Sequence, residues 1–362
     1  MATLVAGSRI SWVDYAKGIC IILVVLMHST FGVERTIGEV GWLHSFITWA
    51  KPFRMPDFFL ISGLFLASRI SRPWPEYIDS KVVHFYYFYA LWMTVQFLFK
   101  GYGIIQHDGI SGLLGQYALA FIEPYSTLWF IYLLPIFFVV TKLLRKIPPI
   151  VVFIIAAILE ALPIASGWTV IDESAARYVY FFAGYWLSNR IFNLATGFKT
   201  LSSAALLASL FIWGVANAWF VNHNLAEAPM ISLALGLVGA GAVVMTAVVL
   251  ERFPVALALR YCGQNSLVIY LAFFVFMAAT RLALLHIWPD GDGGIIALAV
   301  TSIAVGGPLV LYHFVKTTAL TFLFARPKWL SLSTMLLSWH TLHHDKSTTT
   351  IQQPRVSKAK AR

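Results

Sequence analysis

Two basic side chains share one face of the first long apolar segment of the chain. Lys17 and His28 are eleven residues apart, and that spacing returns to nearly the same face of an α-helix, roughly 16 Å further along its axis. An imidazole with an unperturbed pKa of about 6.5 is suited to accept a proton near neutral pH. The pattern predicts a general base at one depth and a cation at another. The structural alternatives are a lysine that extends to the inner interface and a hydrogen-bonded packing histidine.

The second apolar segment begins with charged residues, in the sequence KPFRMPDFFLISG. Arg54 and Asp57 fall at the depth that His28 reaches if both segments cross a bilayer. Pro56 and Gly63 favour a kinked or broken helix, which membranes tolerate only where the backbone faces protein or a water-filled cavity. We therefore expect a polar cavity next to His28.

Three further ionisable residues are candidates for chemistry. Lys81 and His84 are three residues apart and so share a helix face. Such a pair could hold phosphates, or it could simply anchor the chain at the cytoplasmic interface. Glu160 lies in an otherwise apolar segment with no partner in its own helix. It must find a partner across the bundle, stay protonated, or act as an acid or base.

These residues lie in segments whose composition is typical of a membrane protein. Apolar residues make up 59% of the 362 residues and charged residues 12%, and the mean hydropathy is +0.76. An average soluble protein has roughly 45–50% apolar and about 25% charged residues. A spanning helix needs about 20 mostly apolar residues, so the sequence predicts an all-α, polytopic integral membrane helix bundle. Ten spans are predicted, at 10–31, 46–67, 82–99, 127–143, 149–165, 178–196, 201–221, 230–250, 264–285 and 295–324.

Basic and acidic residues gather in alternate connections between these spans. Arg69, Arg72 and Lys81 follow the second span, whereas Glu227 and Asp290 lie in connections on the opposite side. By the positive-inside rule, both termini are cytoplasmic and the number of spans is even. The net charge of +10 then needs no nucleic-acid partner. We expect a multi-pass protein of the inner (plasma) membrane.

The remaining segments flank or connect the predicted bundle. Residues 1–9 are expected to be a cytoplasmic N-terminus, 10–325 a membrane domain, and 326–362 a basic cytoplasmic tail that is disordered from about residue 340. The outer connection 101–126 contains an apolar stretch, 113–122, that is too short to span the bilayer. We expect this stretch to lie at the interface or to re-enter the membrane.

No disulfide or metal site is predicted. Cys20 and Cys262 lie in or beside apolar segments and are expected to be small buried hydrophobic side chains. The tail sequence HTLHHD copies the histidine spacing of membrane di-iron desaturases. Such sites need several histidine boxes, however, and the other histidines are scattered singly.

In order and spacing, several motifs resemble the membrane acyltransferase-3 family, whose members O-acylate glycans and other envelope molecules. The motifs are RISWVDYAKGICIILVVLMH, MPDFFLISG, the Lys81–His84 stretch, STLWFIYLL and CGQNSLVIYL, and with them the resemblance runs from Arg9 to about Phe324. It is to the stand-alone branch, which includes fucose O-acetylase-like enzymes, nodulation-factor acetylases and glucan succinyltransferases. It implies an enzyme that transfers acyl groups other than amino-acyl groups.

The resemblance also implies roles for individual residues. A basic residue eleven positions before a histidine is the motif linked to catalysis in the family, and it matches Lys17 and His28. The R-x-x-R pair associated with the acyl-CoA donor is similar to Lys81 and His84. Lysine keeps the charge without the bidentate fork, and histidine is only partly cationic near neutral pH. Phe273 is a second departure, because the family often has histidine there.

The reaction that follows is O-acyl transfer from a cytoplasmic acyl-CoA, expected to be acetyl-CoA, to a hydroxyl of an envelope or exported glycan or glycolipid. His28 would take the hydroxyl proton as the oxygen attacks the thioester. The candidates to orient this base or to stabilise the oxyanion are Asp57, Arg54 and Ser62. The candidate contacts for the acyl-CoA are Lys17, Lys81, His84, Arg69 and Arg72. Acyl-CoA is a co-substrate, and no permanently bound cofactor is expected.

Two other functions are alternatives. A transporter or flippase would use Glu160, Arg281 and Lys316 as coupling or substrate residues in a cavity, although paired broken helices in two related halves are not apparent. A catalytically silent sensor or assembly partner is compatible with the departures at His84 and Phe273. Transport that does not depend on acyl-CoA would favour the first alternative over an enzyme.

Overall fold

The computed structural model describes residues 10–332, which consist of helices joined by turns and short loops. No β-strand occurs in this range, so the all-α prediction is confirmed. The helices are α1 (Ser11–Ile37), α2 (Leu43–Leu64), α3 (Trp74–Ile78), a π-helical turn (Asp79–Val83), α4 (His84–Leu119), α5 (Trp129–Leu143), α6 (Pro149–Ala161), α7 (Thr169–Trp186), α8 (Ser188–Thr200), α9 (Ser203–Asn222), α10 (Ile231–Leu250), α11 (Leu257–Gln264), α12 (Ser266–Ile287) and α13 (Gly293–Val315).

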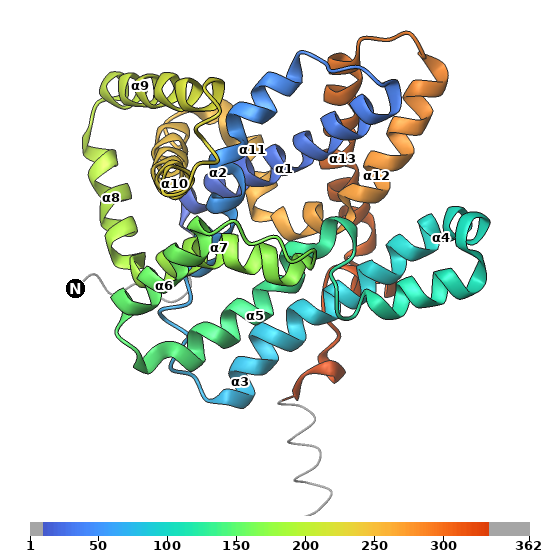
Figure 1. Ribbon diagram of the computed structural model, residues 1–362, viewed down its shortest axis with the longest axis horizontal. Coiled ribbons are helices and arrows are strands. Elements are labelled where there is room, and N and C mark those ends of the chain that lie inside the picture. Colours follow the sequence, from blue (N-terminus) through green and yellow to red (C-terminus); the bar gives the residue numbers. More distant parts are fainter. Residues whose placement is uncertain (1–9, 333–362) are drawn as a thin grey trace, which may run out of the picture.

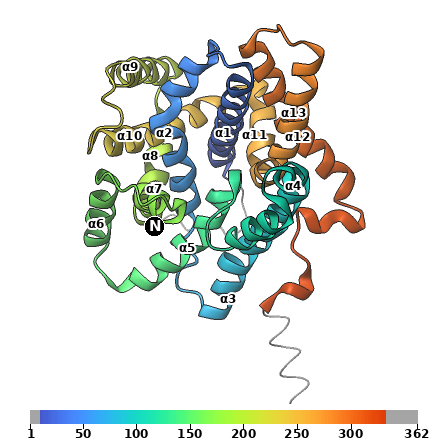
Figure 2. The same cartoon turned by 45° about the vertical axis from the view of Figure 1, so that its right-hand side comes forward.

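Helix α1 lies inside the bundle and contacts α2, α10, α11, α12 and α13 (Figure 1 and Figure 2). Ile21 and Val25 are fully buried on it. The helix ends at Gly38, which has a left-handed φ of 84° and donates its N–H to the carbonyl of Glu34 at 2.8 Å. Glycine is the usual residue at such a helix end, because it has no Cβ to oppose the left-handed conformation. Lys17 and His28 are thus both held on an inner helix of the bundle.

Helices α2 and α7 pack backbone to backbone. A Cβ atom added at Gly63 would collide with the carbonyl oxygen of Phe181, and one added at Gly184 would collide with that of Leu60. Small residues at such contacts let helices approach closely in membranes. Helix α2 is continuous through its two internal prolines, so of the two predicted forms, kinked or broken, the broken one does not occur. Side chains of α7 are consequently held against the middle of α2.

Two predicted segments differ in form from the structure. The sixth predicted span, 178–196, is divided at Leu187 into the end of α7 and the start of α8, because the polar sequence SNR interrupts its apolar pattern. Helix α4 continues past residue 99 and turns at Gly109, where φ is 69°, a value that favours glycine. The predicted interfacial stretch 113–122 thus lies mostly in an arm that returns along α4, and Tyr117 packs against Phe97 with ring centroids 5.1 Å apart.

In residues 10–332, seven helical segments are long and apolar enough to cross a membrane. They are Ser11–Ile37, Trp74–Leu119, Ser126–Lys146, Ser203–Asn222, Ile231–Leu250, Ser266–Ile287 and Gly293–Val315. Helices α2 and α7 carry several charged residues, and α6 has 13 residues, so these three do not reach the same length and apolarity. The chain is a multi-span membrane protein. Ten spans with both termini in the cytoplasm stay a prediction.

The end of the described chain is tied to the turn before α4. Arg326 donates from Nη2 to Asp79 Oδ2 at 2.8 Å, and the backbone N–H of Leu332 donates to Asp79 Oδ1 at 2.7 Å. The predicted N-terminal segment 1–9, the disordered tail and the HTLHHD histidines lie outside the described residues. Among residues 10–332, no group of three or more His, Cys, Asp or Glu side chains is placed to hold a metal ion.

Candidate active site

Two cavities lie inside the bundle, one on each side of a set of aromatic rings. The first, which we call the histidine cavity, has a volume of about 170 Å³. It is lined by His28 of α1, Arg54 of α2 and Arg177 of α7, together with Thr127 and Trp129 at the start of α5. Its lining comes from the second half of α1, the middle of α2 and the first halves of α5 and α7, on the side predicted to face outward. The structure thus brings His28 and Arg54 into one cavity.

His28 is half-buried, and its ring centroid lies 5.6 Å from that of Phe273. Arg54 is only 6% exposed, and its Nη1 donates to the carbonyl of Ile47 at 3.3 Å. The Nε of Arg54 has no partner among the described residues. A buried guanidinium with an unused donor is suited to stabilise negative charge that develops in the adjacent cavity.

Asp57 is placed differently from Arg54, although it follows on the same helix. It is 1% exposed, and neither carboxylate oxygen has a hydrogen-bond partner in the described chain. No hydrogen bond therefore joins Asp57 to His28, and Asp57 does not line the histidine cavity. An unpartnered buried carboxylate is costly. The role of Asp57 in orienting the base stays a prediction.

The second cavity, which we call the lysine cavity, has a volume of about 270 Å³ and lies toward the opposite side of the bundle. It is lined by Lys17 of α1, Ser62 of α2 and Lys81 just before α4. The two ammonium groups lie over aromatic rings: Lys17 Nζ is 5.9 Å from the centroid of Phe65, and Lys81 Nζ is 4.4 Å from that of Phe138. Such cation–π contacts hold a cation in a cavity without neutralising it.

Three aromatic residues, Phe58, Phe130 and Tyr270, line both cavities and separate them. We call these three residues the aromatic partition. The ring centroids of Phe58 and Phe130 are 4.5 Å apart, and those of Phe130 and Tyr270 are 5.5 Å apart. The Tyr270 hydroxyl donates to the carbonyl of Thr127 at 2.7 Å, which fixes its ring. A group that passes between the two cavities therefore meets these rings.

Of the other predicted site residues, Ser62 lines the lysine cavity, whereas Arg69, Arg72 and His84 line neither cavity. Arg69 and Arg72 are exposed in the loop after α2, where their positive charges act on Lys81. His84 packs edge-on against Phe88, with ring centroids 5.1 Å apart, and does not line the lysine cavity. The Ser62 hydroxyl, although it lines that cavity, donates to the carbonyl of Phe58 in its own helix at 2.8 Å.

Two lining residues, Arg177 and Tyr270, have no strong signal in the local sequence. Arg177 follows Glu173 by four residues, and its Nε donates to Glu173 Oε2 at 2.9 Å. That spacing is the signal that could have found it. Tyr270 lies in the CGQNSLVIYL motif, but its position between two cavities depends on where α12 packs.

Glu160 finds its partners across the bundle. Its Oε1 accepts hydrogen bonds from the Tyr180 hydroxyl at 3.0 Å and from Ser232 Oγ at 2.8 Å. Arg281 lies on α12 and Lys316 is exposed at the end of α13, and neither lines the cavity that contains Glu160. The three residues of the transporter interpretation are therefore not gathered in one cavity.

Comparison with known proteins agrees with the motifs of the first two spans. Inner membrane protein YcfT of Escherichia coli (strain K12) is 26% identical over 238 residues, which cover 59% of this chain and 66% of that protein. No solved structure matches the chain significantly. The acyltransferase-3 profile, described as an acyltransferase domain, matches residues 10–313 and so includes both cavities. The chain therefore belongs to the acyltransferase-3 family of membrane proteins.

Proposed function

We propose that the protein is an O-acyltransferase of the inner membrane that moves an acyl group, expected to be acetyl, from cytoplasmic acyl-CoA to a hydroxyl of an envelope or exported glycan. Family membership supports acyl transfer, and the name of the E. coli relative supports the inner membrane. The observation that carries the proposal is the position of the histidine and lysine cavities on opposite sides of the aromatic partition. A cationic cavity suits a phosphorylated donor, and a cavity with an imidazole suits the acceptor hydroxyl.

His28 is the proposed general base. It takes the proton of the acceptor hydroxyl as the oxygen attacks the carbonyl carbon of the thioester, and the carbonyl electron pair moves to oxygen. Arg54, in the same cavity, stabilises the resulting oxyanion. When the tetrahedral intermediate collapses, the carbon–sulfur bond breaks and the proton on His28 passes to the leaving CoA thiolate. His28 returns to its neutral form and CoA leaves as the free thiol, so no other co-reactant is needed.

Lys17 and Lys81 are the proposed contacts for the CoA phosphates. Both line the lysine cavity, on the side predicted to face the cytoplasm. Arg69 and Arg72 add positive charge in the adjoining loop. The thioester reaches His28 only if the aromatic partition opens, because its rings are packed against one another. Donor binding and acyl transfer are thus assigned to different cavities.

The test compares base-labile acyl esters on envelope glycans and lipids from a deletion strain that carries either the wild-type gene or His28→Ala, at matched protein levels in the membrane. We expect esters with the wild type, and a loss of roughly 10²–10⁴-fold with His28→Ala, because a positioned base contributes that much. Equal esters in both strains would refute the role of His28. A wild type that forms no ester but moves a polar substrate without acyl-CoA would favour a transporter.

A further inference from the structure

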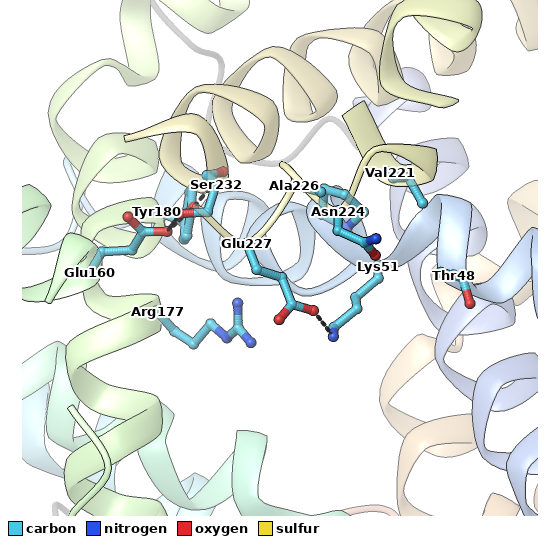
Figure 3. A pocket seen from close by; sticks show the side chains of 11 residues that line it. Thr48, Lys51, Glu160, Arg177, Tyr180, Val221, Asn224, Ala226, Glu227 and Ser232 are labelled. Carbon is cyan, nitrogen blue, oxygen red and sulfur yellow. Dashed lines mark hydrogen bonds and ion pairs between the residues drawn. The ribbon is translucent and has the colours of Figure 1, made fainter. Parts of the chain in front are cut away.

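A third cavity adjoins the histidine cavity on the side predicted to face outward (Figure 3). We call it the Glu160 cavity. Its volume is about 410 Å³, within the range of roughly 300–1,000 Å³ that is usual for small-molecule sites. Arg177 lines both this cavity and the histidine cavity, and Figure 3 shows its guanidinium directed into the Glu160 cavity. Of the described residues, only the Arg177 side chain is common to both linings, so a ligand in the Glu160 cavity would contact a residue that also lines the histidine cavity.

The charges that line the Glu160 cavity are balanced. Lys51 forms an ion pair with Glu227 at the mouth, where the two side chains are 59% and 72% exposed. Arg177 is paired through Nε with Glu173 at 2.9 Å. Among the described lining residues, each of these cations already faces a carboxylate, so the cavity does not offer an uncompensated positive charge to an anion. Hydroxyl groups, which both donate and accept hydrogen bonds, suit such a surface.

Glu160 is fixed at the inner end of this cavity. Its Oε1 accepts from Tyr180, which is 1% exposed, and from Ser232. Its Oε2 is buried and has no partner in the described chain. An ionisable residue inside a membrane bundle is costly and is by default a functional candidate. Two donors from different helices therefore orient a carboxylate in the wall of a polar cavity.

Helix α2 contributes a proline-containing stretch to the same wall. Pro52 and Pro56 lie inside the helix and have no N–H, so they cannot donate to the carbonyls of Thr48 and Pro52, four residues earlier. Thr48 and Pro52 both line the Glu160 cavity. The part of α2 that lines the cavity therefore lacks two of the usual helix hydrogen bonds.

We infer that the Glu160 cavity binds a neutral, polyhydroxylated sugar residue of the acceptor and presents one of its hydroxyls to His28 past Arg177. A neutral sugar supplies a donor for Glu160 Oε1 and acceptors for Asn224 and Arg177. An anionic sugar would meet Glu160 and Glu227 without a free cation. The assignment of this sugar as the acceptor rests on the proposed function, whereas sugar binding itself needs no acyl-CoA.

Binding is measured by saturation-transfer NMR on the purified full-length protein in detergent, without acyl-CoA. The probes are methyl glycosides of glucose, galactose, mannose and fucose, and methyl glucuronide. The wild type should bind at least one neutral glycoside more tightly than the glucuronide. Ala226→Trp places a large ring in the cavity wall and should weaken that binding about tenfold or more, close to 1.4 kcal/mol, whereas Ala226→Ser should leave it within about twofold. Unchanged binding in Ala226→Trp, or no neutral glycoside bound by the wild type, would overturn the inference.

A second pair of variants tests the charge balance and does not depend on how Ala226→Trp folds. Glu227→Gln leaves Lys51 without its carboxylate, so binding of the glucuronide should improve by about threefold relative to the neutral glycoside, as expected for an exposed ion pair. Asp290→Asn, another exposed carboxylate on the same predicted side, should change neither. A glucuronide that binds the wild type more tightly than every neutral glycoside would overturn the assignment.

Acetyl transfer to the same glycosides separates this inference from the proposed function. Ala226→Trp should raise KM for the glycoside and leave KM for acetyl-CoA within about twofold. Sugar binding that Ala226→Trp weakens, in a wild type that transfers no acetyl group, would refute the proposed function and support the cavity as a sugar site. Transfer that is equally efficient in Ala226→Trp and the wild type would support the function and refute the site.

Discussion

His28 has an aromatic neighbour at the position where the family resemblance would often place a second histidine. Phe273 is fully buried, and its ring centroid is 5.6 Å from that of His28. A phenyl ring cannot relay a proton. In the proposed reaction His28 must therefore both accept the hydroxyl proton and return it to the CoA thiolate. The departure changes how the His28 ring is packed and leaves His28 itself in the cavity wall.

Lys81 is the residue whose loss should affect the donor alone. Lys81→Met removes a charge from the lysine cavity, and KM for acetyl-CoA should rise about tenfold or more, because hydrogen bonds to charged groups contribute about 1.5–3 kcal/mol. Lys81→Arg should retain most of the affinity. Lys316→Met, which removes an exposed lysine at the end of α13, is the control. Steady-state kinetics with varied acetyl-CoA would contradict the assignment if Lys81→Met and Lys316→Met gave the same KM.

The sequence predicts candidate residues that the structure places in a cavity wall where the signal is a spacing or a charge within one apolar helix. The spacing of Lys17 and His28 and the position of Arg54 are of this kind. It could not show that Asp57, three residues after Arg54, would leave the cavity wall, because one turn of a helix changes which neighbour a side chain meets. Arg177 became a lining residue only through the contact of α7 with α2, which is a property of the assembled bundle.

At the scale of elements, apolar windows located every helix that carries a site residue but not where each one ends. Such a window averages hydropathy over a helix break. The predicted span 178–196 therefore includes the polar residues after Leu187, although α7 and α8 are separate helices. The turn at Gly109 falls inside the predicted outer connection 101–126, and apolarity alone does not show that α4 continues past residue 99 as a helix. Charged residues in α2 lowered its hydropathy but not its helicity, since α2 is held by close packing against α7.

The contact between α2 and α7 can be tested through its glycines. Gly184→Val introduces methyl groups against the backbone of Leu60, and overpacking of this kind costs about 1–3 kcal/mol. We expect a lower Tm for the purified protein in detergent. Gly197→Val in α8 is the matched control, because an added Cβ there would meet nothing within 4 Å. Equal Tm values for the two variants would show that α2 and α7 do not depend on this close approach.

At the scale of the whole molecule, the aromatic partition should keep outer water from the thioester. Phe130 is 6% exposed and touches both other rings of the partition. Phe130→Ala should therefore raise acyl-CoA hydrolysis in the absence of acceptor, relative to transfer in its presence. Release of free thiol measures the hydrolysis, and Phe211→Ala, which truncates a 74% exposed ring on α9, is the control. A ratio of hydrolysis to transfer that is the same in both variants would mean that the partition does not seal the site.

The orientation of the bundle decides which cavity meets acyl-CoA. Single cysteines are placed at Arg72 and Asp290, which are both exposed, in a protein whose Cys20 and Cys262 are changed to serine. The positive-inside pattern predicts that a membrane-impermeant maleimide labels Asp290→Cys in spheroplasts and Arg72→Cys only in inverted vesicles. If both positions were labelled from the same side, the chain would cross the membrane an even number of times between residues 72 and 290, and the predicted odd number would be wrong.

The reverse labelling pattern would have a larger consequence than a corrected topology. It would turn the lysine cavity toward the outer face and the histidine cavity toward the cytoplasm, because Lys17 and His28, which line the two cavities, follow one another along α1. Cytoplasmic acyl-CoA would then approach His28 directly, and the glycan would have to enter past Lys17 and Lys81. The labelling experiment therefore decides whether the aromatic partition is crossed by the donor or by the acceptor.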